Sequence, residues 1–195
     1  MRNLVRSAIA VVVFTLVLGL AYPALMVAFA SVSFSSKSQG SLIHQNGRIV
    51  GSRLASQAFT WPRYFHPRPS ATSPVYNAGA TTFANLGPTN PDLAKNVRAA
   101  AGAILKLERP YNPGLTIGDI PVDAVTTSAS GIDPDISPAN ARLQSRRVAA
   151  VRKLPLATVQ RLVSQSTSAR SWGIFGEPGV NVLELDLALD RLGGT

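Results

Sequence analysis

Hydrophobic residues are distributed unevenly along the chain, with one long apolar segment near the N-terminus. Residues 8–30 are almost unbroken apolar sequence, and no charged residue occurs between Arg6 and Lys37. About 20 apolar residues in a helix cross the hydrocarbon core of a bilayer, which is about 30 Å thick. The pattern therefore predicts a transmembrane helix over residues 8–30, preceded by a short N-terminal segment, residues 1–7.

The residues that flank this segment predict its orientation. Arg2 and Arg6 precede it, whereas residues 31–36 after it are only Ser, Val and Phe. Because basic flanks stay in the cytoplasm, we expect a cytoplasmic N-terminus and an exported main domain. The alternative is a cleaved signal peptide, since residues 28–30 (Ala-Phe-Ala) match the small-x-small cleavage rule. The apolar segment exceeds the ~7–15 residues of a signal-peptide core, which favours a retained helix.

A polar linker, residues 31–40, leads into a domain over residues 41–195 in which β-like and helical patterns alternate. Asn46-Gly47 predicts a β-hairpin, because Asn and Gly tolerate the positive φ angles of a tight turn. Helical spacing of apolar residues, together with caps and prolines, predicts three helices. These helices cover residues 91–107, 138–153 and 156–166, and a strand at 181–185 precedes a final helical turn or two at 186–192.

Residues 122–141 combine three patterns in succession. Val122, Val125 and the two threonines that follow favour a strand that begins near Ile120. Residues 128–135 are dense in small and turn-forming residues, so the backbone is their main polar surface. Ser137-Pro138 predicts a helix start, with a hydroxyl cap before proline. Together these elements predict an α+β fold, in which about three helices cover a small mixed or antiparallel sheet built from the hairpin and two further strands.

Residues 61–74 contain four prolines interleaved with aromatic and basic side chains. Proline fixes φ and biases the preceding residue toward extended geometry, so this segment is predicted to be a stiff loop. Aromatic and Arg side chains are enriched in protein interfaces, which makes the loop a candidate partner contact. The alternative is an irregular loop packed on its own core. The candidate contact residues are Arg63, Tyr64, Phe65, His66 and Arg68.

The composition narrows the choice of partners without fixing it. The formal net charge is +9, and Arg contributes most of the basic residues, which favours fixed contacts with carboxylates or phosphates. Acidic protein surfaces and anionic lipids fit this charge, whereas nucleic acid does not fit an exported domain. The chain has no cysteine, which excludes disulfides and thiol chemistry.

Motifs for catalysis are missing from the sequence. No glycine precedes a lysine, so there is no P-loop, and the Asp-Lys-Thr-Gly phosphorylation motif of P-type pumps is absent. Ser130 lies in Ser-Ala-Ser-Gly, which lacks the first glycine of a nucleophile elbow. We therefore expect no catalytic residues, and an exported hydrolase that uses Ser130 is the weaker alternative.

The same central region holds several acidic and hydroxyl side chains. It does not match a calcium loop, because Pro138 and Gln144 stand where such a loop needs Gly and Glu. We predict no metal centre, although Asp119, Asp123, Asp133 and Asp135 leave a weak cation site open. The backbone N–H groups at the start of the helix at Pro138 are a candidate anion site. The candidate ligand-loop residues are Asp123, Ser128, Ser130, Gly131, Asp133 and Ser137.

Four separated segments carry a resemblance to a known family, and the Tyr22-Pro23 pair of the apolar segment adds to it. The segments are YFHPRPSA (64–71), NLGPTNP (85–91), PVDAVTTSASGIDPDISP (121–138) and GEPGVNVLELDLALD (176–190). They resemble the C chain of the bacterial Kdp-type potassium-transporting ATPase over nearly the whole chain. Two positions depart from the family pattern: Asp135, where His or Asn is expected, and Asp186, where Asn is expected.

The resemblance implies a non-catalytic subunit of a high-affinity potassium-uptake pump in the bacterial inner membrane. Its implied partners are a potassium-binding, channel-like subunit and the phosphorylated ATPase subunit. The resemblance also implies a catalytic chaperone that contacts ATP and raises the ATP affinity of the phosphorylated subunit. An exported domain, however, lies opposite the cytoplasmic ATP pool. The alternative function is a membrane-anchored exported module that binds cations or docks on the channel-like subunit.

Overall fold

The computed structural model describes residues 1–193, which divide into two compact units between Val50 and Gly51. The first unit opens with a continuous helix over Arg2–Ser33, whose mean hydropathy reaches 2.4 and whose apolar window is not buried in the protein. At 1.5 Å per residue, the 32 residues span about 48 Å. The helix is thus long and apolar enough to cross a membrane, and it extends beyond the predicted residues 8–30 at both ends.

A short π-helical turn interrupts the α-helical hydrogen bonding near Pro23. The helix consists of α1 (Arg2–Leu16), the π-helix η1 (Val17–Ala21) and α2 (Tyr22–Ser33). The N–H of Tyr22 donates to the carbonyl of Val17, five residues back, and Pro23 follows in the first turn of α2. Since Pro23 has no N–H to donate, the wider turn adjusts the helix around it, and the helix continues beyond the proline.

A short helix and a β-hairpin follow. The helix α3 (Ser35–Ser38) lies within the predicted polar linker, and the hairpin consists of β1 (Leu42–Gln45) and β2 (Arg48–Ser52). The turn residues Asn46 and Gly47 have φ angles of 51° and 76°. Both positive angles are those of the tight turn that the Asn-Gly pair predicts, so the hairpin is confirmed.

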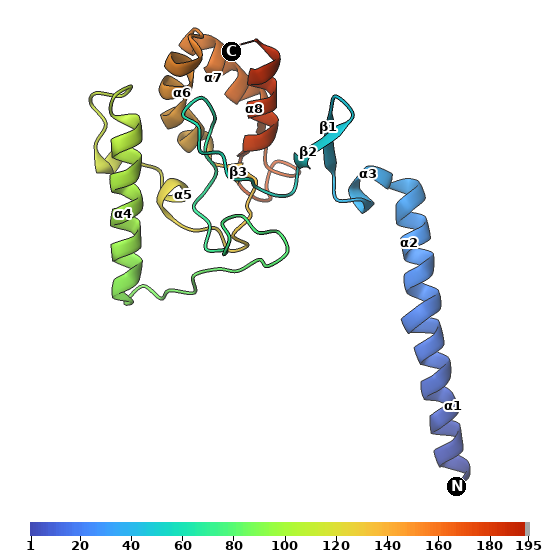
Figure 1. The fold of residues 1–195 in the computed structure, drawn as a ribbon. Helices are drawn as coiled ribbons and strands as arrows, with labels where there is room; N and C mark the ends of the chain where they lie inside the picture. The colour runs from blue at the N-terminus through green and yellow to red at the C-terminus, as the bar shows by residue number, and fades with distance from the viewer. Residues whose placement is uncertain (194–195) are drawn as a thin grey trace. The chain divides into compact units, whose positions relative to one another are not determined.

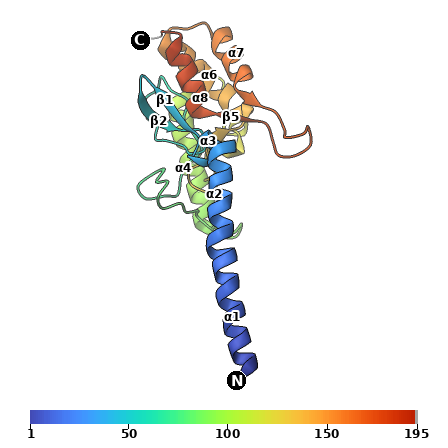
Figure 2. The same ribbon diagram turned by 90° about the vertical axis from the view of Figure 1, so that its right-hand side faces the viewer.

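The second unit is an α+β domain, which confirms the predicted fold class. Its helices α6, α7 and α8 are grouped together in both views (Figure 1, Figure 2). The elements in chain order are α4 (Pro91–Glu108), the 3₁₀ turn η2 (Ile117–Asp119), α5 (Val122–Val125), β3 (Asp135–Ile136), α6 (Pro138–Arg152), α7 (Leu156–Gln165), β4 (Thr167–Ser168), β5 (Gly179–Asn181) and α8 (Val182–Arg191).

The sheet of this unit is small and antiparallel. Its strand order is β3-β5-β4, with Ile136 and Thr167 both paired to Val180 of the central strand. The β1–β2 hairpin forms a separate two-stranded sheet. The prediction of one sheet that includes the hairpin was therefore wrong. Strands of two or three residues leave too little sequence for an alternating pattern to reveal them.

The predicted strand that begins near Ile120 was also wrong. Residues Val122–Val125 form one turn of helix, α5, which begins after Pro121 and buries Ala124. The hydroxyl of Thr126 donates to the carbonyl of Val122 at 2.8 Å, which closes the turn from its C-terminal side. Tertiary burial and this side-chain bond override the strand preference of the β-branched residues.

The last helix starts earlier than predicted. The strand near residue 181 is β5, and it ends at Asn181 itself, where α8 begins. The side chain of Asn181 accepts a hydrogen bond from the N–H of Glu184 at 3.1 Å. This is an N-cap, and the Asn-x-x-Glu spacing is a sequence signal that identifies it.

The hydrophobic core joins α6, α7 and α8 to the small sheet. Val159 and Val163 of α7 are buried in this core, and Leu156 of the same helix is partly buried against it. Phe65, from the proline-rich loop, is fully buried in the same core. The buried members of the core are Phe65, Ile136, Ala141, Val148, Ala149, Val159, Val163, Val180, Val182, Leu185 and Leu189.

Asp186 of α8 is a carboxylate beside this core and is only 2 % exposed. Its Oδ1 accepts the N–H of Phe65 at 2.9 Å, whereas Oδ2 is buried without a hydrogen-bond partner. Burial raises the pKa of Asp186 well above its usual value. Asp186 therefore favours its neutral form in the folded chain.

We expect Asp186→Asn to raise the stability of the chain at neutral pH. Because the folded pKa is raised, the stability that Asp186 contributes is full below its unfolded pKa of about 4 and falls as pH rises toward the folded pKa. Asn keeps the acceptor for Phe65 and cannot ionise, so the variant should lose this fall. The unfolding temperature in detergent, measured between pH 4 and 8, reports this loss of stability.

Asp92→Asn, at an exposed position of α4, is the control and should keep the pH dependence of the unchanged chain. If the unfolding temperature of Asp186→Asn decreased with pH as steeply as that of the unchanged chain, burial of the Asp186 carboxyl would not be the cause.

Candidate functional site

The two loops predicted to carry the site lie side by side in the second unit. The Nη1 of Arg68 donates to Oδ2 of Asp133 at 3.0 Å, and its Nη2 lies 3.4 Å from the hydroxyl of Thr126. The N–H of Ser128 donates to the carbonyl of Pro69 at 3.2 Å. The proline-rich loop is thereby joined to the loop that follows α5, across about sixty residues of sequence.

Arg147 of α6 fixes the first part of the proline-rich loop. This side chain is fully buried, and its Nε donates to Oε1 of Glu108, at the end of α4, at 2.7 Å. Its Nη1 donates to the carbonyls of Pro62 and Tyr64, the latter at 2.8 Å. Burial raises the pKa of Glu108, and the positive charge of Arg147 opposes that shift. One guanidinium therefore ties α4 and the loop to α6.

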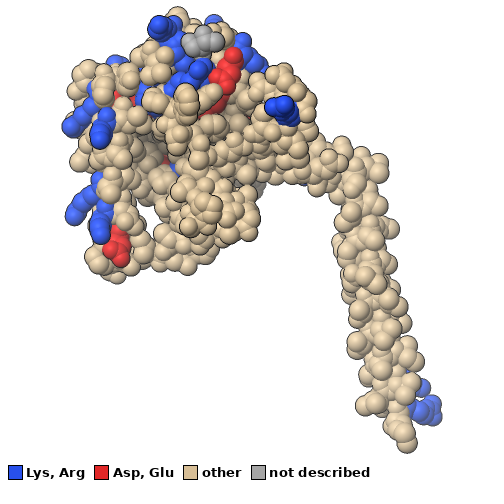
Figure 3. All heavy atoms as spheres, in the orientation of Figure 1, with Lys and Arg blue, Asp and Glu red and all other residues tan. Residues whose placement is uncertain are grey.

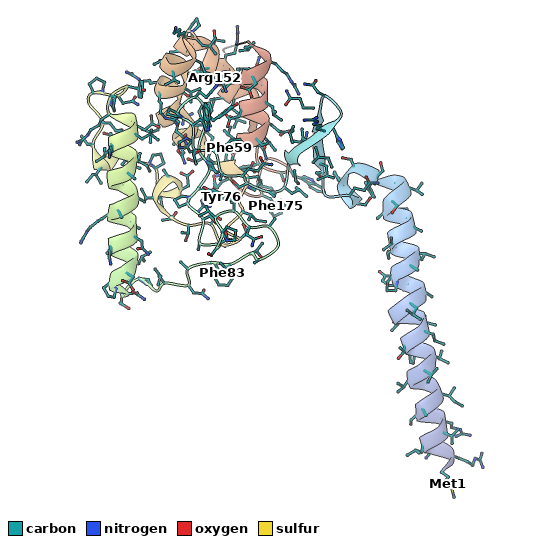
Figure 4. All side chains as sticks on the ribbon, in the orientation of Figure 1. Met1, Phe59, Tyr76, Phe83, Arg152 and Phe175 are labelled. Atoms are coloured by element: carbon teal, nitrogen blue, oxygen red, sulfur yellow. The ribbon has the colours of Figure 1, made fainter. Side chains whose placement is uncertain are left out.

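A second arginine of α6, Arg152, also contacts the backbone of the proline-rich loop. Arg152 donates from Nε to the carbonyl of Arg63 at 2.7 Å and forms an ion pair with Asp190 of α8 at 2.8 Å. Its guanidinium lies 5.0 Å from the ring centre of Tyr64, whose hydroxyl donates to Asp190 at 3.2 Å. Burial is the main cause that raises the pKa of Tyr64. Figure 4 shows Arg152 among the helices of the core.

These contacts turn much of the candidate partner loop toward its own core. Phe65 is fully buried, and Arg63, Tyr64, His66 and Arg68 are half-buried. Trp61, at the start of the loop, is 68 % exposed. The side chain of Phe65 therefore stabilises the fold, and Trp61 is the large side chain of the loop that faces solvent.

His66 is held by a pair of backbone bonds to a glutamine of α6. Its N–H donates to Oε1 of Gln144 at 2.7 Å, and Nε2 of Gln144 donates to the carbonyl of His66 at 3.0 Å. Burial, together with the nearby charge of Arg147, lowers the pKa of His66 to about 4. The imidazole is therefore neutral at physiological pH.

The predicted anion site at the start of α6 is filled by a carboxylate of the chain itself. Asp123 of α5 accepts the N–H of Ser137 at 2.8 Å, the hydroxyl of Ser137 at 2.8 Å and the side-chain amide of Asn140 at 3.0 Å. The hydroxyl of Ser137 also caps the helix by accepting the N–H of Asn140 at 3.0 Å. The carboxylate of Asp123 thus occupies the place at the start of α6 where an external anion would bind.

The loop between α5 and β3 is stabilised by its own serines and by one required glycine. The hydroxyl of Ser128 accepts the N–H of Gly131 at 2.9 Å, and that of Ser130 accepts the N–H of Ile132 at 3.2 Å. Gly131 has φ of +73°, and a Cβ there would lie 2.7 Å from the carbonyl oxygen of Thr82. Ser130 therefore serves its own turn, and no histidine contact to its hydroxyl occurs among residues 1–193.

The four carboxylates considered for a cation site have separate partners. Asp119 accepts two bonds from Thr116, Asp123 caps α6, and Asp133 pairs with Arg68. Asp135 accepts a bond from the amide of Asn181 at 3.2 Å. Within residues 1–193, no three His, Asp or Glu side chains gather as a metal centre would require.

A groove of about 450 Å³ beside α4 was not predicted from the sequence. Ala100, Ala103, Ile104 and Leu107 of α4 form one side, and the molecular surface is hollowed beside this helix (Figure 3). Phe59 and Tyr76, labelled in Figure 4, belong to the opposite side, and His66 also lines the groove. The sequence signal for this groove was the row of small apolar residues in α4. Helical spacing alone, however, does not distinguish a helix face packed in the core from one that lines an open groove.

Comparison with known proteins finds sequence matches over nearly the whole chain. The family model described as KdpC, "K+-transporting ATPase, c chain", matches residues 4–191. Three similar proteins are each named "Potassium-transporting ATPase KdpC subunit". The protein of Burkholderia vietnamiensis is 48% identical over 100% of this chain and 99% of its own length, and that of Herpetosiphon aurantiacus is 50% identical over 98% of both. The protein of Beijerinckia indica subsp. indica is 47% identical over 93% of this chain and 90% of its own.

A family match over residues 4–191 covers the apolar helix, the hairpin and the α+β domain alike. The identities of 47–50% extend over at least 90% of these three relatives. The chain therefore belongs to the KdpC family, the c chain of K⁺-transporting ATPases.

Proposed function

We propose that this chain is a non-catalytic, single-span subunit that holds a high-affinity potassium-uptake ATPase together. The observation that carries the proposal is its end-to-end match to relatives named as a subunit of a potassium-transporting ATPase. The contacts of the candidate site support the same role. Arg147, Arg152, Asp123 and Gln144 are bonded to other parts of the chain, as in a rigid structural module.

The proposed arrangement places the α+β domain on the exported face of the inner membrane. The helix Arg2–Ser33 spans the bilayer, and the basic residues at its N-terminal end stay in the cytoplasm. On that face, the domain reaches the exported surface of a channel-like, potassium-binding subunit. The phosphorylated ATPase subunit is the second proposed partner, and it is reached through contacts in or near the membrane.

A nucleoside triphosphate does not fit the groove beside α4, the loop around Arg68 or the start of α6. Such a ligand needs several cationic or N–H donors around its phosphates. The groove beside α4 has no Lys or Arg among the residues that line it, Arg68 is paired with Asp133, and the N-terminus of α6 is filled by Asp123. If the chain raises the ATP affinity of the pump subunit, we propose that it does so through protein contacts. Its membrane topology decides whether the domain can meet cytoplasmic ATP.

Protease protection of the full chain in sealed membrane vesicles tests this topology. In inside-out vesicles the exported face lies in the lumen, so we expect the α+β domain to resist added protease until detergent opens the membrane. In right-side-out vesicles the same domain should be cleaved without detergent. A tag after the C-terminus reports cleavage, and a cytoplasmic protein is the control for sealing. Cleavage of the domain only from the cytoplasmic side would overturn the proposed topology.

Substitutions of two aromatic residues in the proline-rich loop distinguish an effect on partner binding from an effect on folding. Trp61→Ala removes an exposed ring, so we expect weaker retention of the partner subunits in a tag pull-down with little change in unfolding temperature. Phe65→Ala removes a buried ring, so it should cost about 3–5 kcal/mol of stability. Full partner retention by Trp61→Ala would show that this side of the loop is not a contact.

A further inference from the structure

The segment between β4 and β5 carries three large apolar side chains that lie close together in sequence and are mostly exposed. Trp172 is 92% exposed, Ile174 69% and Phe175 64%. Figure 2 shows this segment projecting from the second unit beyond α7 and β5. We call residues 171–175 the apolar tip. Exposed apolar groups of this kind mark a surface that meets a protein or a membrane.

The apolar tip is a structured turn. The N–H and carbonyl of Ser171 exchange hydrogen bonds with those of Phe175, both at 2.9 Å. Trp172 and Gly173 have φ angles of 56° and 78°, as a tight hairpin turn requires. A turn fixed by its own backbone presents its side chains without further ordering on contact, which favours binding.

The base of the apolar tip is closed by an ion pair. Arg170 Nη2 lies 2.7 Å from both carboxylate oxygens of Glu177, on the opposite limb of the segment. The charged pair thereby separates the apolar tip from the rest of the domain. The exposed apolar surface consists of three side chains only. A stable protein interface buries about 800 Å² on each partner, so this surface is small for one.

We propose that the apolar tip inserts into the interfacial region of the lipid bilayer. This inference rests on the membrane anchorage proposed above. Trp prefers the membrane interface, where its ring lies at the level of the headgroups, and Ile and Phe beside it add apolar surface. A bilayer interface therefore matches the shape and composition of this surface.

The anchor helix keeps the lipid within reach of the domain. The 18 residues from the end of α2 at Ser33 to Gly51 span at most about 60 Å even when extended. Tethering raises the effective concentration of the bilayer around the domain, so a small apolar knob is sufficient for contact. The apolar tip would then act as a second, reversible attachment beside the transmembrane helix.

The chain has two tryptophans, Trp61 and Trp172, which allows a direct test. In a Trp61→Phe variant, Trp172 is the only fluorescent indole of the full chain. The variant is reconstituted in vesicles of phosphatidylcholine and phosphatidylglycerol, with and without bromine on the acyl chains. We expect shorter-wavelength emission than in detergent and several-fold stronger quenching by bromine near the ester groups than near the chain ends. The matched control, Trp172→Phe, leaves the exposed Trp61 of another loop, which should be quenched by aqueous acrylamide and not by the lipid.

A further variant keeps the reporter and weakens the apolar tip. Ile174→Ser with Phe175→Ser, in the Trp61→Phe background, should lower the bromine quenching of Trp172 several-fold. Flotation of each variant with the vesicles shows separately whether the helix anchors the chain. If the chain floats and Trp172 is quenched by acrylamide but not by brominated lipid, the proposal is overturned. It is also overturned if Trp172 becomes shielded only when the partner subunits are present, because the apolar tip then contacts protein.

Discussion

The second unit depends on one buried positive charge, the guanidinium of Arg147. A charged side chain that is fully removed from water is tolerated only when an opposite charge and hydrogen bonds surround it. Glu108 supplies the charge, and Pro62, Tyr64 and Gln144 supply oxygen acceptors. These partners come from the end of α4, the proline-rich loop and α6 itself. The geometry of Arg147 therefore requires these three parts of the domain to be in place together.

The position of the proline-rich loop has consequences for both the core and the surface. With its backbone held by Arg147 and Arg152, the loop places Phe65 in the core and leaves Trp61 exposed. The same loop then pairs with Asp133 through Arg68 and forms one side of the groove beside α4. The polar groups that a sequence reader would assign to a ligand are thereby used to stabilise the domain. Among the apolar side chains that remain exposed, Trp61 and those of the apolar tip are suited to the proposed contacts with partner subunits and lipid.

The sequence predicted the elements that have local signals. The Asn-Gly turn, the cap at Ser137 and the helical spacing of apolar residues in α7 each identified an element correctly. Predictions failed where distant contacts decide the structure. The strand-like residues of α5 form a helical turn because Ala124 is buried, and strands as short as β3 have no pattern of their own.

In the candidate site, too, local sequence patterns predict less than the contacts between distant residues reveal. Arg142 and Arg146 of α6, and Lys153 at its C-terminal cap, are exposed. Arg147 and Arg152 belong to the same helix and are buried, but nothing in their spacing distinguishes them from the exposed cations. Apart from Gln144, which precedes Arg147 by three residues, their partners lie about 40 to 90 residues away, so only the folded chain reveals the network. The role of Asp123 was missed for a related reason, because it caps a helix that starts fourteen residues later.

A double-mutant cycle on Arg147 and Glu108 tests most directly whether this buried pair organises the domain. Arg147→Met should lower the free energy of unfolding by about 3–5 kcal/mol, because it leaves Glu108 buried without its counter-charge. In Arg147→Met with Glu108→Leu no such charge remains, so the double variant should be more stable than the sum of the single changes by about 1–3 kcal/mol. Unfolding of the full chain by urea in mild detergent measures each value. Additive losses, within about 0.5 kcal/mol, would contradict the account.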